Sequence, residues 1–544
     1  MQEAWFIIVV SLCISALVRA ILSCISRSSR GVGTGDLLPP GPQSIPLIGN
    51  LIWLRQPLSE LEFVLRRLKT RYGPIITMRI GRRPFIFIGS HSLAHRALVQ
   101  KGANFSDRPV PPPTSKILNR NQKAISSAAY GPTWRLLRRN LTQEILHPAR
   151  VKSHSGSRRW VLSILMTRLL STTHSVRLMD HFQYAMFCLL VLMCFGDKLQ
   201  ESAIRDIEAV QRRILVGFRR FNSLNFWPQL LSKILLRKRW NELMQLRLDQ
   251  ERVLIPLIRG RTAINGNVKD RDHEEVACYV DTLVDLQLPE ENRKLDEAEM
   301  VSLCSEFLSA GTDTTSTALQ WIMANLVKYP HIQDKLYNQI RDVVGLPPPL
   351  PSSCSSGLAN NNIHPAGGED HEEAAAAFMK ALAVVEEEDL QKMPYLKAVV
   401  LEALRRHPPG HFVLPHKVTR DVELDGYVIP KNALVNFMVA DMGWDPDVWE
   451  DPMEFKPERF CKEEASDFDV TGSKEIKMMP FGAGRRVCPG STLALLHLEY
   501  FVANLIWYFQ WRPLEGEEID LSEKQEFTTV MKNPLRARIS PRIN

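Results

Sequence analysis

Residues 481–490 read Phe-Gly-Ala-Gly-Arg-Arg-Val-Cys-Pro-Gly, and this stretch decides how the rest of the chain is interpreted. Its cysteine, Cys488, is followed by a mostly apolar run, Ser491 to Trp507, which predicts a helix. A cysteine just before a helix N-terminus lies at the positive end of the helix dipole, which favours the thiolate. A thiolate can serve as the axial ligand of a haem iron, where it favours cleavage of the O–O bond.

The neighbours of Cys488 suit such a ligand. The glycines let the backbone turn tightly and pass close to a flat macrocycle, and Arg486 offers a charge-assisted donor to a carboxylate. A single cysteine, taken alone, is more often a small buried apolar side chain. The ordered set Phe481, Gly484, Arg486, Cys488 and Gly490 reverses that preference, because it fits the pattern F-x-x-G-x-R-x-C-x-G at every fixed position.

On these residues the chain resembles the cytochromes P450, and more narrowly the plant microsomal enzymes of the A type. The resemblance implies a mainly α fold with a small β lobe near the N-terminus and an N-terminal transmembrane helix. It implies haem b (iron protoporphyrin IX) as cofactor, with Cys488 as the iron ligand. Arg486, Phe481 and Gly482 are the cofactor-binding residues that it implies around the cysteine.

Composition sets broader limits. The 544 residues are 45% hydrophobic and 24% charged, which is ordinary for a globular protein. A formal net charge of +8 is mild for this length, so it does not argue for nucleic-acid binding; it suits an anionic membrane surface and an acidic partner. Nine cysteines without a regular framework indicate reduced thiols and a reducing compartment.

The N-terminal region predicts a membrane anchor. Ala4 to Ile25 is almost wholly apolar and as a helix would span about 33 Å, against roughly 30 Å of bilayer hydrocarbon. Glu3 precedes the run while Arg27 and Arg30 follow it, which leaves the body in the cytosol. A cleaved signal peptide is the alternative, opposed by the lack of basic residues before the run. We therefore expect an anchor at 1–25, a basic, proline-rich hinge at 26–50 and a catalytic domain at 51–544.

A long helical pattern runs from Leu295 to Val327 and contains Ala-Gly-Thr-Asp-Thr-Thr at 310–315. Glycine and threonine are poor choices for a helix interior, so this break in a local rule indicates a functional site. Gly311 would let a ligand approach the backbone, and Thr314 can bond back to a carbonyl or donate outward. The resemblance implies that Asp313 and Thr314 are the catalytic acid–alcohol pair; a threonine-rich helix face is the alternative.

A second helix, predicted at Met393 to Arg406, places Glu402 and Arg405 on one face. The later run 455–460, Phe-Lys-Pro-Glu-Arg-Phe, contributes Arg459. An E-x-x-R pair alone is weak, since most helices contain one. Its order before this run and the cysteine stretch strengthens it, and the resemblance implies a buried structural triad of Glu402, Arg405 and Arg459.

The resemblance assigns roles to further positions. Trp134 and Arg138, four apart on a predicted helix, would bind a haem propionate, and so would His416, for which a surface histidine is the alternative. By analogy the substrate cavity would be lined by four residues: Gly311, Phe412, Val413 and Thr528.

Two regions stay open. Residues 347–388 depart from the family and, with low hydrophobicity and clustered acids, predict a solvated low-complexity insertion. It is a lineage feature or an error in the gene model. Residues 221–240 mix apolar and basic side chains and would either dip into the membrane interface or pack on the core.

The sequence thus predicts a haem-thiolate monooxygenase that inserts one oxygen atom of O2 into a small hydrophobic organic substrate. Its implied partners are NADPH–cytochrome P450 reductase and membrane lipid, with no nucleic acid, in a single-pass endoplasmic-reticulum protein with a cytosolic catalytic domain. Residues 393–416 and 472–480 resemble one plant A-type family, a relative in which acts on chlorophyll breakdown products by oxidative deformylation. The alternatives are a P450-fold isomerase or dehydratase that needs no reductase, and a non-enzymatic haem sensor or electron carrier.

Overall fold

The computed structural model describes most of the chain beyond the predicted anchor. The described residues are 38–45, 49–50, 58–120, 122–171, 176–226, 229–267, 277–349, 382–461 and 468–542, with the single positions 11, 15, 19 and 53. The predicted anchor at 1–25, most of the hinge at 26–50 and residues 350–381 of the predicted insertion therefore lie outside the description.

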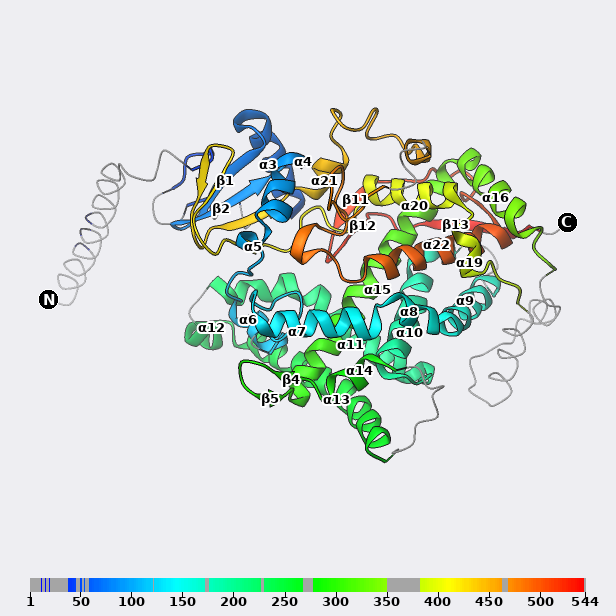
Figure 1. The fold of residues 1–544 in the computed structure, drawn as a ribbon, viewed down its shortest axis with the longest axis horizontal. Coiled ribbons are helices and arrows are strands. Elements are labelled where there is room, and N and C mark those ends of the chain that lie inside the picture. Colours follow the sequence, from blue (N-terminus) through cyan, green and yellow to red (C-terminus); the bar gives the residue numbers. More distant parts are fainter. Residues whose placement is uncertain are drawn as a thin grey trace. The chain divides into compact units, whose positions relative to one another are not determined.

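The described chain forms two compact units, each built from segments that are distant in the sequence (Figure 1). The first unit comprises residues up to Pro109, His411–Asp445 and Asp469–Val487. The second comprises Val110–Gly410, Pro446–Phe468 and the chain from Cys488 onward. Helices dominate the second unit and the main sheet lies in the first, as the sequence predicts for a mainly α fold with a small β lobe.

The first unit is organised around a four-stranded sheet with the strand order β1-β2-β9-β6. β1 (Ile75–Ile80) and β2 (Arg83–Ile88) form a hairpin, antiparallel with Ile75 opposite Ile88, and β2 runs parallel to β9 (Leu434–Phe437). Alternate residues of β2 enter two core clusters: Ile86 packs in one, while Phe87 packs in the other with residues of α3 (Leu58–Tyr72). Both faces of the sheet are therefore covered.

Short elements complete the first unit. They are α4 (His91–His95), the π-helix η2 (Arg96–Gln100), α5 (Gly102–Phe105), β6 (His416–Lys417), the hairpin β7 (Val422–Leu424) and β8 (Tyr427–Ile429), α21 (Val439–Gly443) and the 3-10 helix η7 (Gly484–Arg486).

The second unit is built on α15 (Glu297–Lys328), the predicted long helix. It starts at a capping box, in which the Asp296 side chain accepts from the Glu299 N–H and the Glu299 side chain accepts from the Asp296 N–H. α10 (Leu178–Phe195) packs along α15 and is the one helix among the described residues that is apolar and long enough to cross a membrane. Because 89% of it is buried in the protein, it is a core helix of this unit.

The remaining elements of the second unit surround this pair. The helices are α6 (Pro113–Leu118), α7 (Pro132–Asn140), η3 (Leu141–Ile145), α8 (Pro148–Ser153), α9 (Ser155–Leu170), α11 (Glu201–Phe221), η4 (Asn222–Phe226), α12 (Gln229–Leu235), α13 (Arg237–Asn267), α14 (Tyr279–Leu283), α16 (Pro330–Val344), α19 (Glu387–Leu390), α20 (Pro394–Arg406), η5 (Pro457–Phe460) and α22 (Ser491–Tyr508). The strands are β3 (Val176–Arg177), β4 (Gln287–Leu288), β5 (Arg293–Lys294), β10 (Phe509–Arg512), β11 (Glu523–Gln525), β12 (Thr529–Met531) and β13 (Arg536–Pro541).

The structure corrects the predicted end of the insertion. Residues 382–388, which the composition assigned to a solvated loop, are packed in the second unit: the Val385 N–H donates to Asn504 Oδ1 at 2.8 Å inside the core. Glu387 accepts two hydrogen bonds, of 2.6 and 2.8 Å, from the fully buried Arg158. The acidic run looked solvated because its cationic partner is more than 200 residues away in the sequence.

Candidate active site

Cys488 lies in the second unit, three residues before α22 begins. Burial raises the pKa of its thiol, while a hydrogen bond from the Gly490 N–H and the positive charge of Arg138 act in the opposite direction. The sulfur keeps a partly exposed surface. This donor set fits a metal ligand, because a coordinated cation supplies the charge that deprotonates a buried thiol and the N–H then stabilises the thiolate.

Arg138 of α7 lies near enough to Cys488 for their charges to interact. Trp134 is buried at 6% exposure, Arg138 is half-buried on the same side of the helix, and Arg135 and Arg139 are exposed. Burial lowers the pKa of the Arg138 guanidinium, and the charge of Cys488 raises it again. A half-buried cation beside a candidate haem ligand fits the predicted contact with an acidic group of the cofactor.

The residues before Cys488 belong to the first unit. Gly484 has a φ of +68°, and a Cβ there would lie 2.0 Å from the carbonyl oxygen of Leu98, so this position needs glycine. Arg486 Nε donates to the Ser106 carbonyl at 2.8 Å. Phe481 and Gly482 are partly exposed, with Val413 the side chain nearest to Gly482.

His416 uses one ring nitrogen inside the protein. It is buried at 3% exposure, and its Nδ1 lies 2.6 Å from the Phe105 carbonyl, to which it must donate. Burial, with the charges of Arg108 and Arg486, lowers the pKa of the imidazole to about 3. Only Nε2 is left for the predicted propionate contact, which stays a prediction. Arg108, which the sequence analysis missed, is the buried cation of this cluster.

Residues at the centre of α15 differ in their exposure. Ala310 is exposed in a helix otherwise buried along most of its length, and Thr314 is partly exposed beside it. A Cβ on Gly311 would lie 2.6 Å from Leu190 Cδ1, so this glycine serves the close packing of α10 on α15. The expectation that Gly311 lets a ligand approach stays a prediction, and Ala310 is the more exposed position beside it.

Thr314 and its neighbour Asp313 have different surroundings. The Thr314 hydroxyl donates to the Ala310 carbonyl at 2.6 Å, one of the two arrangements that its position in mid-helix allowed. Burial raises the pKa of Asp313 to about 6, and the charge of Arg212 and a hydrogen bond from Gln183 only partly offset this. Gln183 and Arg212 were not predicted, because α10 and α11 contribute them from about 100 residues away.

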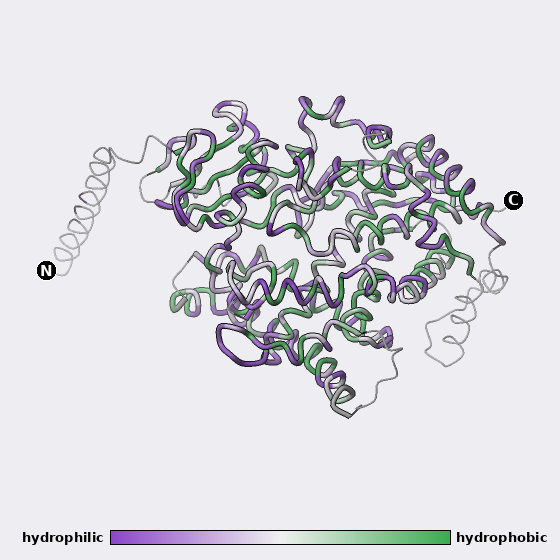
Figure 2. The backbone as a smooth tube through the Cα atoms, in the orientation of Figure 1, coloured by the Kyte–Doolittle hydropathy of each residue, from purple (hydrophilic) through white to green (hydrophobic). Residues whose placement is uncertain are grey.

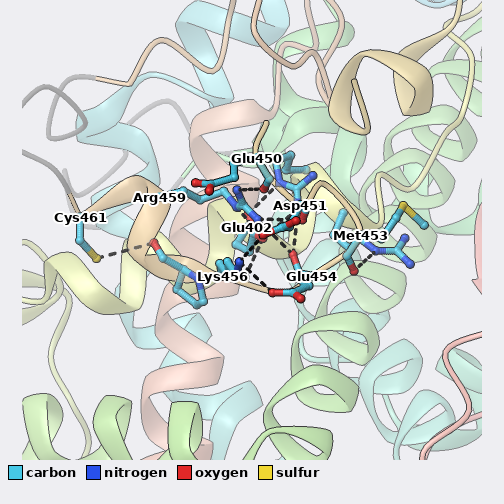
Figure 3. A network of polar contacts seen from close by, with 11 residues as sticks. Glu402, Glu450, Asp451, Met453, Glu454, Lys456, Arg459 and Cys461 are labelled. Carbon is cyan, nitrogen blue, oxygen red and sulfur yellow. Dashed lines mark hydrogen bonds and ion pairs between the residues drawn. The ribbon is translucent and has the colours of Figure 1, made fainter. Parts of the chain in front are cut away.

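The buried triad forms within the second unit (Figure 3). Glu402 is fully buried and accepts from Arg405 at 2.7 and 2.9 Å and from Arg459 Nε at 3.1 Å. The Lys456 N–H adds a fourth donor at 2.8 Å. Arg459 also donates to the carbonyl of Glu450 at 2.7 Å, which ties the segment before η5 to α20.

The predicted cavity residues divide into two groups. Phe412 and Val413 are partly buried in the first unit. Thr528, in the second unit, is buried, and its hydroxyl lies 2.9 Å from that of Thr317 on α15, so it does not face an open cavity. Its neighbour Phe527 is 53% exposed and is the better candidate for contact with a ligand.

Comparisons with known proteins agree with this arrangement. A family model described as Cytochrome P450 matches residues 39–352 and 370–540, which confines the unmatched insertion to 353–369. The chain is 50% identical over 518 residues to Cytochrome P450 89A9 of Arabidopsis thaliana, covering 93% of this chain and 94% of the relative. It is 30% identical over 543 residues to costunolide synthase of Cichorium intybus, covering 96% and 97%. A solved zebra fish cytochrome P450 with abiraterone shares the fold, with a TM-score of 0.66 at 20% identity over 89% of this chain and all of that one.

Proposed function

Because the chain belongs to the cytochrome P450 family, it is a haem-dependent monooxygenase, and we propose that it inserts one oxygen atom of O2 into a C–H bond of a small hydrophobic molecule with electrons from NADPH. One observation carries the proposal: a partly exposed cysteine that receives a backbone N–H and lies beside an arginine, directly before a helix. The plant relatives support a role in plant metabolism.

The bound haem would supply the redox chemistry that activates O2. Cys488 would be the protein ligand of its iron, and the Gly490 N–H would stabilise the thiolate sulfur. Trp134 and Arg138 would hold its acidic groups. The triad around Glu402 would hold η5 and the segment before it against α20, without touching the cofactor or substrate.

Two residues of α15 would manage protons. Asp313, with a pKa of about 6, can hold a proton at slightly acidic pH and release it near neutrality. The Thr314 hydroxyl donates its hydrogen to the Ala310 carbonyl, so its oxygen can still accept a hydrogen bond from a proton donor. When the hydroxyl turns away from that carbonyl, it can donate its own proton. Asp313 and Thr314 are therefore the catalytic pair of this proposal.

The electron donor would be NADPH–cytochrome P450 reductase. Arg135 and Arg139 are exposed on α7, on the helix whose other side carries Trp134 and Arg138. Exposed cations so close to the candidate haem contacts suit an acidic partner that must bring electrons to this region.

Plant A-type members are typically microsomal, and we place the chain at the endoplasmic-reticulum membrane with its catalytic body in the cytosol. α12 supports a second lipid contact besides the anchor, since Leu230, Ile234 and Leu235 are 61–71% exposed. The helix as a whole is drawn largely in the hydrophobic colour in Figure 2. Lys233 lies on the same helix, and Arg237 opens the next one. Slower amide exchange in α12 on adding anionic vesicles would support the contact, and unchanged exchange would contradict it.

The test of the activity is NADPH-dependent O2 consumption by the full chain with a plant reductase. The parent protein should show the reduced-CO absorbance band of thiolate-ligated haem, and Cys488→Ser should lose both the band and O2 use. Cys461→Ser, which alters another thiol of the second unit, should keep both. A retained band in Cys488→Ser would remove the ligand assignment. Turnover of substrate without NADPH would favour an isomerase or dehydratase, and haem binding without turnover a sensor or carrier.

The substrate can be sought by comparing metabolites between a plant lacking this gene and its parent. Accumulated chlorophyll breakdown products would support the expectation drawn from residues 393–416 and 472–480. Accumulation of an unrelated lipophilic compound would replace it, leaving the monooxygenase assignment unchanged.

A further inference from the structure

A small, partly open cavity lies in the second unit, where α10, α11 and α15 meet. Its volume is about 20 Å³, and its polar lining comes from Gln183, Glu208, Gln211, Arg212, Ser309, Thr312 and Asp313. A buried water needs about 10–15 Å³ and two to four polar partners. The cavity therefore has room for one water beside the carboxyl group of Asp313.

The amide of Gln211 has a fixed orientation. Arg247 can only donate, and its Nη1 donates to Gln250 Oε1 at 2.7 Å. Gln250 Nε2 then donates to the Ser305 hydroxyl at 2.6 Å, so the Ser305 proton goes to Gln211 Oε1, also at 2.6 Å. Ser309 donates to the same oxygen at 3.2 Å. Because Gln211 Oε1 accepts hydrogen bonds from these two serines, Nε2 is the polar atom of this amide that can bind a group in the cavity.

Two buried polar atoms at the cavity have no protein partner. Among the residues that the structure describes, neither Gln211 Nε2 nor Thr312 Oγ1 has a hydrogen-bond partner, although the side chains are only 2% and 6% exposed. Buried donors left unsatisfied are costly, and a bound water is the usual remedy. One water between them would accept from Gln211 and bond to the Thr312 hydroxyl.

The opposite wall of the cavity orients Asp313. Arg212 donates to Gln183 Oε1, so the Gln183 amide nitrogen faces Asp313 Oδ1, 3.4 Å away. The charged groups that act on Asp313 are Arg212 and Glu208 of α11 and Glu526 beside the β11–β12 hairpin. Arg212 is the one cation among them, so Asp313 lies in a setting of mixed charge.

Glu208 connects the cavity with solvent. Its side chain is 20% exposed and pairs with Arg205 at 3.5 Å, while it also lines the cavity. Burial raises the pKa of this carboxyl, despite the opposing charges of Arg205, Arg212 and Arg168. It can therefore take a proton from bulk water and present it to the interior.

We propose that the cavity holds one ordered water, positioned by Gln211 Nε2, which carries protons from Glu208 to Asp313. The carboxylic acid of Glu208 gives its proton to the water, and the water gives one of its own to an Asp313 oxygen. Glu208 is then reprotonated from solvent, so the water and the charge of the protein are restored each time Asp313 releases a proton. This inference rests on the proposed function, because Asp313 needs reloading only if it supplies protons during turnover.

The test compares Gln211→Met with the matched control Gln320→Met. Both replace a buried glutamine by a side chain of similar shape. Gln320 Nε2 also has no partner within the described chain, but it does not line the cavity. Two readouts are independent of turnover: the ordered water in a crystal structure, and the pH midpoint of the Asp313 carboxyl band in infrared spectra.

We expect the water in the parent and in Gln320→Met, and its loss in Gln211→Met. The Asp313 midpoint should rise by about one pH unit in Gln211→Met, because its carboxylate loses a solvating donor. NADPH-driven turnover should fall about tenfold with a larger solvent deuterium effect, and the thiolate–CO band should not change. A Glu208→Gln variant should slow turnover similarly while keeping the water.

A parent structure without the water, or a Gln211→Met variant with the parental infrared midpoint, would overturn the inference. If Gln211→Met does not fold, the inference is judged by whether the parent structure contains the water and whether Glu208→Gln slows turnover. If the parent uses O2 and both Gln211→Met and Glu208→Gln turn over at the parental rate, the water relay is contradicted and the proposed function stands. If the parent lacks the thiolate band and O2 use, the proposed function fails, and the water and infrared midpoint still judge the cavity.

Discussion

Two carboxylates of the second unit, Glu402 and Asp313, are both removed from bulk water but are treated in opposite ways. Glu402 is fully buried, and its oxygens accept four hydrogen bonds from two arginines and a backbone N–H. Asp313 has one long hydrogen bond from Gln183 and faces a cavity. Glu402 is paired with two arginines, whereas burial of Asp313 is only partly offset by Arg212 and Gln183 and raises its pKa to about 6.

Under the proposed function, the contrast separates a structural carboxylate, Glu402, from one that transfers protons, Asp313. A buried ion group with every acceptor used holds one geometry, and removing one partner leaves a stranded charge. A carboxylate with few partners can change protonation at little structural cost, which is what proton transfer near neutral pH requires. The predictions below test each side of this comparison.

The largest effect is expected for Glu402→Ala. It leaves the guanidinium of Arg405, which is fully buried, without its carboxylate, and this should cost about 3–5 kcal/mol of unfolding free energy. Denaturant titration would measure the loss, and the variant should fail to retain haem. Asp285→Ala, which breaks an exposed pair with Lys294, should cost no more than about 1 kcal/mol. If both variants lost the same unfolding free energy, Glu402 would contribute no more to stability than an exposed ion pair.

A second large effect is expected for Asp313→Asn, in turnover. The amide keeps the shape and the contact with Gln183 but cannot deliver a proton, so NADPH-driven product formation should fall about 10²–10⁴-fold. The thiolate–CO band should persist, because Asp313 does not hold the cofactor. A variant within threefold of the parent would show that Asp313 works as a structural residue, like Glu402.

Asp313 should also give the protein a pH-dependent stability. Its folded pKa of about 6 exceeds the ordinary value of 3.8, so the folded state binds more protons between these values and stability falls as pH rises through that window. The free energy of unfolding of the parent, compared with that of Asp313→Asn, should be similar at pH 4. By pH 7 the parent should have lost up to about 3 kcal/mol of it relative to the variant. Melting temperatures measured from pH 4 to 7.5 would show this divergence.

Asp520→Asn is the control for that measurement. Hydrogen bonds from Ser522 lower the pKa of exposed Asp520, so its contribution is fully present above pH 4 and is lost only in more acidic solution. The difference between this variant and the parent should be flat from pH 4.5 to 7.5. A flat profile for Asp313→Asn as well would mean that burial does not perturb Asp313.

The smallest effect on stability, with a clear one on chemistry, is expected for Thr314→Ala. Losing the hydroxyl and its bond to the Ala310 carbonyl should change the unfolding free energy by about 1 kcal/mol or less. NADPH use should uncouple from product, with peroxide released instead. Thr314→Ser, which restores the hydroxyl, should recover coupling; uncoupling that persists in the serine variant would point to packing of the methyl group.

The sequence predicted whatever depends on order and periodicity. Residues 481–490 identified the family, which the comparisons confirm, and the sequence pattern located α15, α20 and α22 to within a few residues. Local patterns suffice there because a helix or hairpin is specified by residues that are close along the chain. The membrane anchor and the residue roles remain predictions.

What the sequence could not predict depends on which side chains meet across long separations. Gly311 faces Leu190, His416 donates to Phe105, Thr528 bonds Thr317, and Glu387 binds Arg158, each contact spanning more than 100 residues. The chain of hydrogen bonds from Arg247 to Gln211, which fixes the orientation of the Gln211 amide, likewise joins three helices. The sequence by itself determined the fold class and the candidate iron ligand, because both follow from local order. Only the packed structure decided which carboxylate is locked and which can titrate, since burial and hydrogen-bond partners are properties of the tertiary arrangement.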